Sequence, residues 1–222
     1  MTVGSTVSKR TGRTASPQVR RQQLINATIE SIAKRGFSET TLAHVTSGAK
    51  LSQGIVNFHF RSKELLFLET IGFLANEHIT RWRETLDKSG ASPQERLMAL
   101  IDTDFHPKIC TRKKLSVWFA FYGDTKYRAA YRQRCEKIDS ERLAETQRLC
   151  ELIKQEGGYD GVRSRQFANG LEAFIDGLWL NMLLYPKTFS RAEAKEQCMA
   201  YLVATFPKHF DLAGETGPGG VK

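Results

Sequence analysis

The chain has 222 residues, is 41% hydrophobic and carries a formal net charge of +9, which is enough apolar material for one large domain or two small ones. No stretch approaches the roughly 18 consecutive apolar residues of a membrane-spanning helix, and the basic start lacks the apolar core of a secretory signal. The four cysteines lie far apart without CxxC spacing, so we expect a reduced, cytoplasmic location and no disulfide framework.

The basic side chains are concentrated near the N-terminus. Residues 1–66 contain ten lysines and arginines but only three glutamates. A solvated basic face is one explanation of this pattern. The other is a partner that is an anionic polymer, because clustered lysines and arginines neutralise phosphates and release counterions.

Almost the whole chain has apolar residues at helical spacing, with glycine and proline between the segments and no strand-like alternation. This pattern predicts an all-α fold of about nine helices. The two ends, residues 1–15 and 213–222, are polar or glycine-rich and are expected to be disordered. The basic segment 1–15 is either an arm that follows DNA or a leader without that role.

Two very short helices are predicted after a first helix that Ser16 caps. They lie at about 42–48 and 53–59, with Ser52 as the cap of the second, and Ser62 caps a longer helix that follows. Two short helices joined by a tight turn are typical of a helix-turn-helix.

The second short helix cannot bury a full apolar stripe. Ile55 and Val56 can face inward, which leaves its polar and aromatic side chains outside. Asparagine and glutamine suit the edge of adenine, phenylalanine suits the methyl group of thymine, and the remaining polar groups suit phosphate oxygens. We therefore predict that residues 16–66 bind DNA through Thr41, Ser52, Gln53, Asn57, Phe58, His59 and Lys63, and a family resemblance of the same segment adds Gly54.

The larger second part, residues 67–212, is predicted to be a helical bundle. Two capping boxes, Ser92 with Glu95 and Ser190 with Glu193, each open a helix in it. No acid–base pair, nucleophile or phosphate-binding loop is visible, so we predict no enzyme and no cofactor.

The segment TLAHVTSGAKLSQGIVNFHFRSKELL resembles the DNA-binding segment of TetR-family transcriptional regulators, and the resemblance is specific over about residues 20–66. It is carried by Thr41, Val45, Ala49, Leu51, Ser52, Gly54, His59, Phe60, Ser62, Lys63, Glu64 and Leu66. Lys50 replaces the usual turn glycine, which predicts a strained or reshaped turn. Asn57 stands where tyrosine is commonest, which favours a base contact over a phosphate contact.

The second part is similar to one branch of this family. DTDFHPKICTRKKLSVWFAFYGDT and FIDGLWLNMLL are similar to the ligand domain of the BetI-type, choline-responsive repressors. The resemblance implies effector binding and a homodimer through the last two helices, for which the apolar stripes on 163–184 and 190–206 could supply the faces. The alternative is that these stripes are core within one chain, as part of each is expected to be. A twofold dimer would match a pseudo-palindromic operator.

An effector pocket is predicted around the run VWFAFYGD. Its aromatic wall would consist of Trp118, Phe121, Tyr122 and Trp179, which could cage a quaternary ammonium group. Asp176 would be the counter-charge. The alternatives are that the aromatic residues are core and that the aspartate is hydrogen-bonded to a neighbouring helix.

A metal site is not expected. His106 and Cys110 have the spacing of two ligands on a helix, but Pro107 interrupts that helix and no second ligand pair is visible. The sequence thus predicts a DNA-binding repressor released by an effector that is choline-like or another small metabolite. The alternatives are a helical-bundle ligand-binding protein or enzyme without specific DNA binding, and a non-specific nucleoid-binding protein.

Overall fold

A computed structural model describes residues 15–211, which form nine α-helices and no strand. The expected all-α fold is confirmed. In chain order the helices are α1 (Pro17–Arg35), α2 (Leu42–Ala49), α3 (Gln53–Phe60), α4 (Lys63–Lys88), α5 (Pro93–Asp104), α6 (Arg112–Gly123), α7 (Arg128–Gly157), α8 (Ser164–Leu184) and α9 (Arg191–Thr205). None of the helices within the described range is both long and apolar enough to span a bilayer. Apart from Ala15, the predicted tails lie outside this range.

The helix starts follow the predicted caps. The Ser16 hydroxyl accepts the Val19 amide at 3.3 Å, and both capping boxes, at Ser92 and Ser190, are complete. Ser52 stands at the N-cap position of α3, but its side chain makes no capping hydrogen bond. Ser52 is thus the N-cap residue, as predicted, and its side chain is exposed to solvent.

The turn between α2 and α3 is strained, as the replacement of glycine predicts. Lys50 adopts the left-handed conformation, with φ 55° and ψ 41°, which costs a residue with a β-carbon about 1 kcal/mol. Arg61, directly after α3, is the other non-glycine residue between 15 and 211 with positive φ. An unfavourable backbone conformation thus occurs at the C-cap of α2, in the turn before α3, and again at the C-cap of α3.

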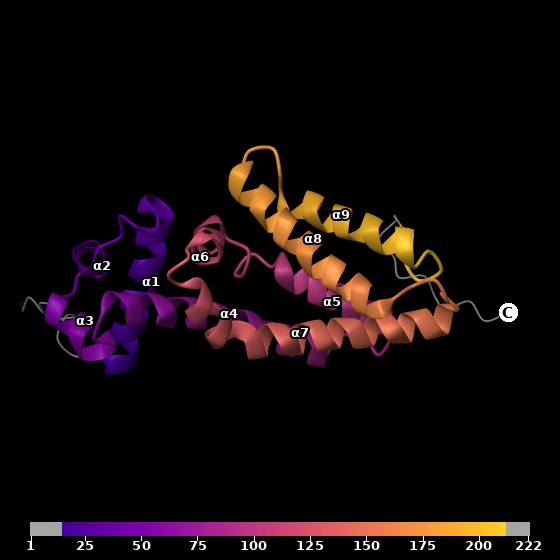
Figure 1. Cartoon of the computed structure of the whole chain (residues 1–222), viewed down its shortest axis with the longest axis horizontal. Helices are drawn as coiled ribbons and strands as arrows, with labels where there is room; N and C mark the ends of the chain where they lie inside the picture. Colours follow the sequence, from indigo (N-terminus) through magenta and orange to yellow (C-terminus); the bar gives the residue numbers. More distant parts are fainter. Residues whose placement is uncertain (1–14, 212–222) are drawn as a thin grey trace, which may run out of the picture.

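The helices form an elongated molecule with α1, α2 and α3 at one end (Figure 1). Helix α4 leads from this end into the body, where α7 runs alongside it and α8 and α9 lie on the far side of α5. The boundary predicted between residues 66 and 67 falls inside α4, which is continuous through it.

An aromatic cluster joins the small end to the body. The ring of Phe37, after α1, lies 4.6 Å from Phe67 of α4 and 4.9 Å from Phe121 of α6. Tyr127, before α7, is 4.8 Å from Phe37. Because such buried edge-to-face contacts are specific in geometry, they fix α1 against the helices of the body.

Candidate DNA-binding surface and effector cavity

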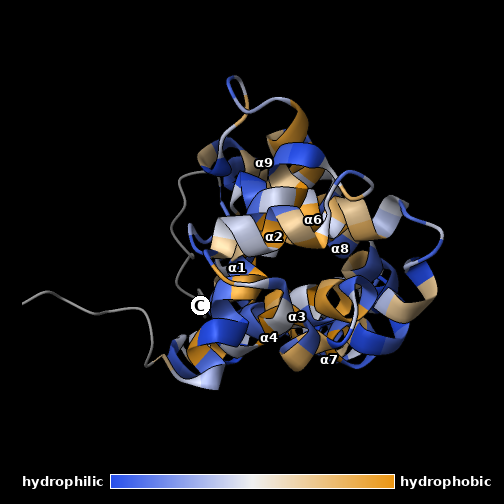
Figure 2. Cartoon of the chain, turned by 90° about the vertical axis from the view of Figure 1, so that its left-hand side faces the viewer, coloured by the Kyte–Doolittle hydropathy of each residue, from blue (hydrophilic) through white to orange (hydrophobic). Residues whose placement is uncertain are grey.

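One face of α3 is buried and the other is open to solvent. Val56 and Phe60 are buried and hold the helix on the core, while Gln53 and Asn57 are exposed. Phe58 is 77% exposed, which has no benefit for folding. Figure 2 views the molecule from this end, with α1, α2 and α3 toward the reader. The short helix therefore presents polar and aromatic groups outward.

Of the eight predicted DNA-binding residues, five lie on α3, Thr41 and Ser52 are the N-caps of α2 and α3, and Lys63 is the first residue of α4. Six are exposed and two are half-buried. Of the half-buried pair, His59 packs against Phe58, and the Lys63 ammonium lies 5.2 Å from the Phe67 ring centre. Thr41 caps α2 by accepting the His44 amide at 3.2 Å.

Two basic residues of this region were not among the predicted contacts. Lys50 and Arg61 flank α3, are exposed, and form no ion pair with any residue between 15 and 211. Arg21, by contrast, forms an ion pair with Glu69. The resemblance pointed to Lys50 as a departure from the family pattern, but only the backbone conformation distinguishes Arg61.

A cavity of about 310 Å³ lies between α4, α6, α7 and α8. Four of the five predicted effector residues line it, namely Trp118, Tyr122, Asp176 and Trp179. The Trp118 ring is 6.4 Å from Trp179 and 6.3 Å from Tyr122. Phe121 is fully buried in the junction with α1 and does not line the cavity.

The rest of the wall comes from residues that the sequence did not single out. They are His78, Ile79, Trp82, Tyr131, Ile138, Asp139, Ser140, Arg142, Leu143, Asn169, Glu172 and Ile175. Helix α7 had the pattern of a highly charged, solvated helix, so its contribution was missed. The spacing of Tyr131, Asp139 and Arg142 places them on one face of the helix, and this spacing could have indicated that α7 contributes to the cavity.

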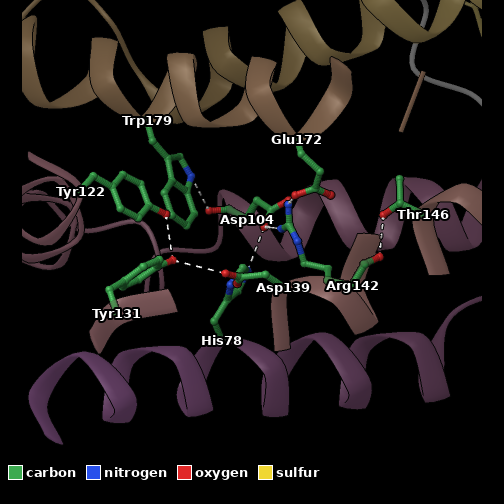
Figure 3. Close-up of polar contacts among 9 residues, drawn as sticks. All are labelled: His78, Asp104, Tyr122, Tyr131, Asp139, Arg142, Thr146, Glu172 and Trp179. Atoms are coloured by element: carbon green, nitrogen blue, oxygen red, sulfur yellow. Dashed lines mark hydrogen bonds and ion pairs between the residues drawn. The ribbon is translucent and has the colours of Figure 1, made fainter. Parts of the chain in front are cut away.

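A buried polar network forms one side of the cavity (Figure 3). Asp104, which is 1% exposed, lies at its centre. Its carboxylate is 2.8 Å from the His78 ring nitrogen Nε2 and 2.5 Å from Arg142 Nη1, and its backbone carbonyl accepts the Trp179 indole N–H at 3.1 Å. Arg142 also pairs with Glu172. Four helices are therefore tied together by one arginine and one aspartate.

A second chain of hydroxyl groups leads to Asp139. Tyr131 lies 3.4 Å from the Tyr122 hydroxyl and 3.4 Å from the Asp139 carboxylate. Burial raises the pKa of both tyrosines, so they remain hydrogen-bond donors at neutral pH. Burial also raises the pKa of Asp139, and Arg142 opposes this change.

Asp176 is an unpaired carboxylate at the cavity. Within residues 15–211 it forms no hydrogen bond or ion pair, and it is an exposed residue that lines the cavity. The surrounding protein raises its pKa to about 6, first by desolvation and then through Asp104 and Asp139, while Arg142 and His78 act in the opposite direction. A cation in the cavity would relieve this unfavourable charge.

The two residues considered for a metal site have different partners. The His106 ring contacts Arg81, and its pKa is lowered by desolvation and by nearby cations. The Cys110 thiol is buried against the Met182 sulfur at 3.4 Å. No group of three or more potential metal ligands occurs in the described part of the chain.

These features together define a helix-turn-helix regulator: a small helical end that exposes a short helix, joined to a bundle with an internal cavity. The family models agree. Residues 24–70 match "Bacterial regulatory proteins, tetR family", and residues 93–207 match "BetI-type transcriptional repressor, C-terminal".

Curated relatives carry the same assignment. An HTH-type transcriptional regulator BetI from Burkholderia thailandensis is 32% identical over 190 residues, which cover 83% of this chain and 92% of that one. The BetI regulator from Paraburkholderia phymatum is 33% identical with the same coverage. The chain therefore belongs to the TetR family of transcriptional regulators and has a C-terminal domain of the BetI repressor type, which confirms the predicted resemblance. Both relatives are named as transcriptional regulators.

Solved structures show the same architecture. A transcriptional regulator from Pseudomonas aeruginosa PAO1 superposes with a TM-score of 0.74 and 25% identity, covering 86% of this chain and 91% of that one. A regulator from Saccharomonospora viridis, solved in complex with choline, has a TM-score of 0.73, 19% identity and coverages of 83% and 96%. At that identity the second match shows the fold alone.

Proposed function

We propose that this chain is a homodimeric repressor that binds a pseudo-palindromic operator through α3. Its effector would be a small organic cation, choline-like or another small metabolite, held in the cavity between α4, α6, α7 and α8. The choline complex of the Saccharomonospora viridis regulator supports this ligand class by analogy.

The outward face of α3 is the observation that carries the proposal. Gln53 and Asn57 are exposed beside a 77% exposed Phe58, on a helix of eight residues. Amide side chains suit the adenine edge in the major groove, and an aromatic ring suits the thymine methyl group. Exposed Lys50 and Arg61 would bring positive charge to the phosphates on either side.

The end of α8 supports a twofold dimer. Leu180, Leu184 and Tyr185 are 38%, 57% and 57% exposed in the single chain. Large apolar side chains gathered on one helix end favour a protein interface. A twofold axis there would pair two α3 helices about one turn of DNA apart, roughly 34–36 Å, or somewhat more.

The helices of the cavity wall also contact the DNA-binding end. Helix α4 begins at Lys63, two residues after α3, and carries His78, Ile79 and Trp82 in the wall. Helix α6 carries Trp118 and Tyr122 in the wall and packs on α1. An effector that binds one arrangement of α4 and α6 more tightly would favour the matching separation of the two α3 helices. Its difference in affinity for the two arrangements limits how far it can shift the equilibrium between them.

Selection of bound sites from random DNA by the full-length protein tests the DNA-binding part. A palindromic consensus bound above the salt-dependent background is expected. Equal affinity for all sequences would instead identify a non-specific nucleic-acid-binding protein.

The effector is then sought among quaternary amines and other metabolites that release the selected operator. A small cation that releases the DNA is the expected result. Tight cation binding by a protein that binds no DNA would favour the alternative of a ligand-binding bundle.

A further inference from the structure

We infer that the effector carries two positive centres, so that Asp176 of α8 and Asp139 of α7 each pair with one of them. This inference rests on the proposed cationic effector and goes further by giving its charge. The ligand class is a short aliphatic dication, such as a diamine in which one or both nitrogens are alkylated.

The charges of the wall do not balance within the protein. Arg142 is the one lysine or arginine among the residues that line the cavity, and it is shared between Asp104 and Glu172. Glu172 is thereby paired. Asp139 and Asp176 form no ion pair within residues 15–211, and Arg142 and His78 act on them only at longer range.

The two unpaired carboxylates lie on different helices that face the same cavity. Asp139 has one polar contact, the 3.4 Å hydrogen bond from Tyr131, and Asp176 has none. Both side chains remain exposed, so a ligand can reach them. Each carboxylate still has unused acceptor capacity, since an ionised carboxyl group can accept several hydrogen bonds.

A monocation would leave this site incomplete. Paired with Asp176 beside Trp118 and Trp179, one ammonium group would neutralise a single charge and leave the charge of Asp139 unpaired in the same cavity. Asp139 is among the groups that raise the pKa of Asp176, after desolvation and Asp104, so the two carboxylates repel each other. A second ammonium group within reach of Asp139 would remove that repulsion and add a charge-assisted hydrogen bond.

The aromatic side chains suit one of the two centres better than the other. Trp118, Trp179 and Tyr122 offer ring faces for an alkylated ammonium. Asp139 is approached by the Tyr131 hydroxyl and is better suited to an N–H donor. The cavity therefore fits an asymmetric dication, with a bulky ammonium toward the tryptophans and a primary ammonium toward α7.

Matched ligands test this inference directly. (3-Aminopropyl)trimethylammonium and (3-hydroxypropyl)trimethylammonium have nearly the same shape and differ by one positive charge, and the corresponding four-carbon pair varies the spacing. Binding is measured by titration calorimetry with the full-length protein at pH 7. In at least one pair the dication should bind about tenfold or more tightly, the effect of one additional charged hydrogen bond.

Two variants on the same helix locate the effect. Asp139→Asn keeps the shape of the side chain and should abolish the preference for the dication. Glu136→Gln removes an exposed negative charge one turn earlier on α7, outside the cavity, and should retain the preference. Thermal unfolding curves verify that both variants are folded.

The outcomes separate the two proposals. If both members of each pair bind equally, or if Asp139→Asn retains the preference, the dication inference is wrong while a cationic effector remains. If both variants lose the preference for the dication equally, the dication inference is also wrong. The preference would then come from the overall negative charge of α7 and not from Asp139 itself. If none of the four cations binds, the proposed effector class itself is wrong.

Discussion

The outward face of α3 and the wall of the cavity both present polar side chains without partners, but they do so in different ways. On α3 the exposed groups come from one segment of eight residues, and each can act alone on DNA. At the cavity the lining residues come from four helices, and the unpaired carboxylates Asp139 and Asp176 lie beside a network in which Asp104 and Arg142 hold His78 and Glu172. A polar group on α3 can thus be changed without loss of the fold, whereas a change in the cavity network affects the whole body.

The strongest test of this contrast is Arg142→Met. The substitution leaves Asp104 with His78 alone and Glu172 without a partner, so we expect the free energy of unfolding to fall by about 3–5 kcal/mol, the usual cost of breaking a buried ion pair. Urea unfolding followed by circular dichroism measures it.

Arg148→Met is the matched control for Arg142→Met. Arg148 lies on the same helix and pairs with Glu145, but its side chain is 51% exposed, so a change within about 1 kcal/mol is expected. Equal losses in the two variants would contradict a special role for the buried network.

A smaller effect is expected on α3, and it should concern DNA alone. Asn57→Ala removes the side chain best suited to adenine and should relax the base preference at one operator position, at a cost of about 1–3 kcal/mol for the preferred base. The selected-sequence profile of the variant measures this change. An unaltered profile, or a loss of thermal stability comparable to that of Arg142→Met, would disprove the assignment.

The third prediction concerns pH and the cavity. As pH falls from 7.5 to 5, Asp176, with its pKa near 6, takes up a proton, and the affinity for a cationic effector should fall by about tenfold. Asp176→Asn should bind the cation weakly and remove the part of the pH dependence that is due to this carboxylate. A pH profile that is identical in the variant would exclude Asp176 as the counter-charge.

For the free protein the effect of this group on stability has the opposite sign. The folded protein holds the Asp176 proton at a higher pH than the unfolded chain does. This carboxylate therefore favours folding more as the pH falls from about 6 toward its ordinary pKa.

The smallest expected effect is that of Lys63→Ala. Lys63 is the first residue of α4, the helix that follows α3, where a positive charge is unfavourable for the helix dipole. Its ammonium group lies over the ring of Phe67. We expect weaker binding to every DNA sequence. The slope of log affinity against log salt concentration should fall by about one, the effect of losing one phosphate contact. A loss confined to one sequence would argue against a phosphate contact.

The sequence was informative where function depends on neighbouring residues. The short helix from Gln53, the strained turn at Lys50 and both capping boxes could be recognised because caps and turns depend on residues within a few positions of one another. The aromatic residues of α6 and α8 were selected for the same reason, since each belongs to a short local pattern.

The sequence by itself determined that the chain is helical, that its basic end carries a short exposed helix, and which family it resembles, because helical spacing and local motifs carry that information. The tertiary structure decided that Phe121 belongs to the junction with α1 and that α7 supplies Tyr131, Asp139 and Arg142 to the cavity. It also decided which carboxylates are paired: Asp104 and Glu172 are close to Arg142, and Asp139 and Asp176 are not paired with it. Such pairings join residues as many as 38 positions apart, and only the packing of the helices brings those positions together.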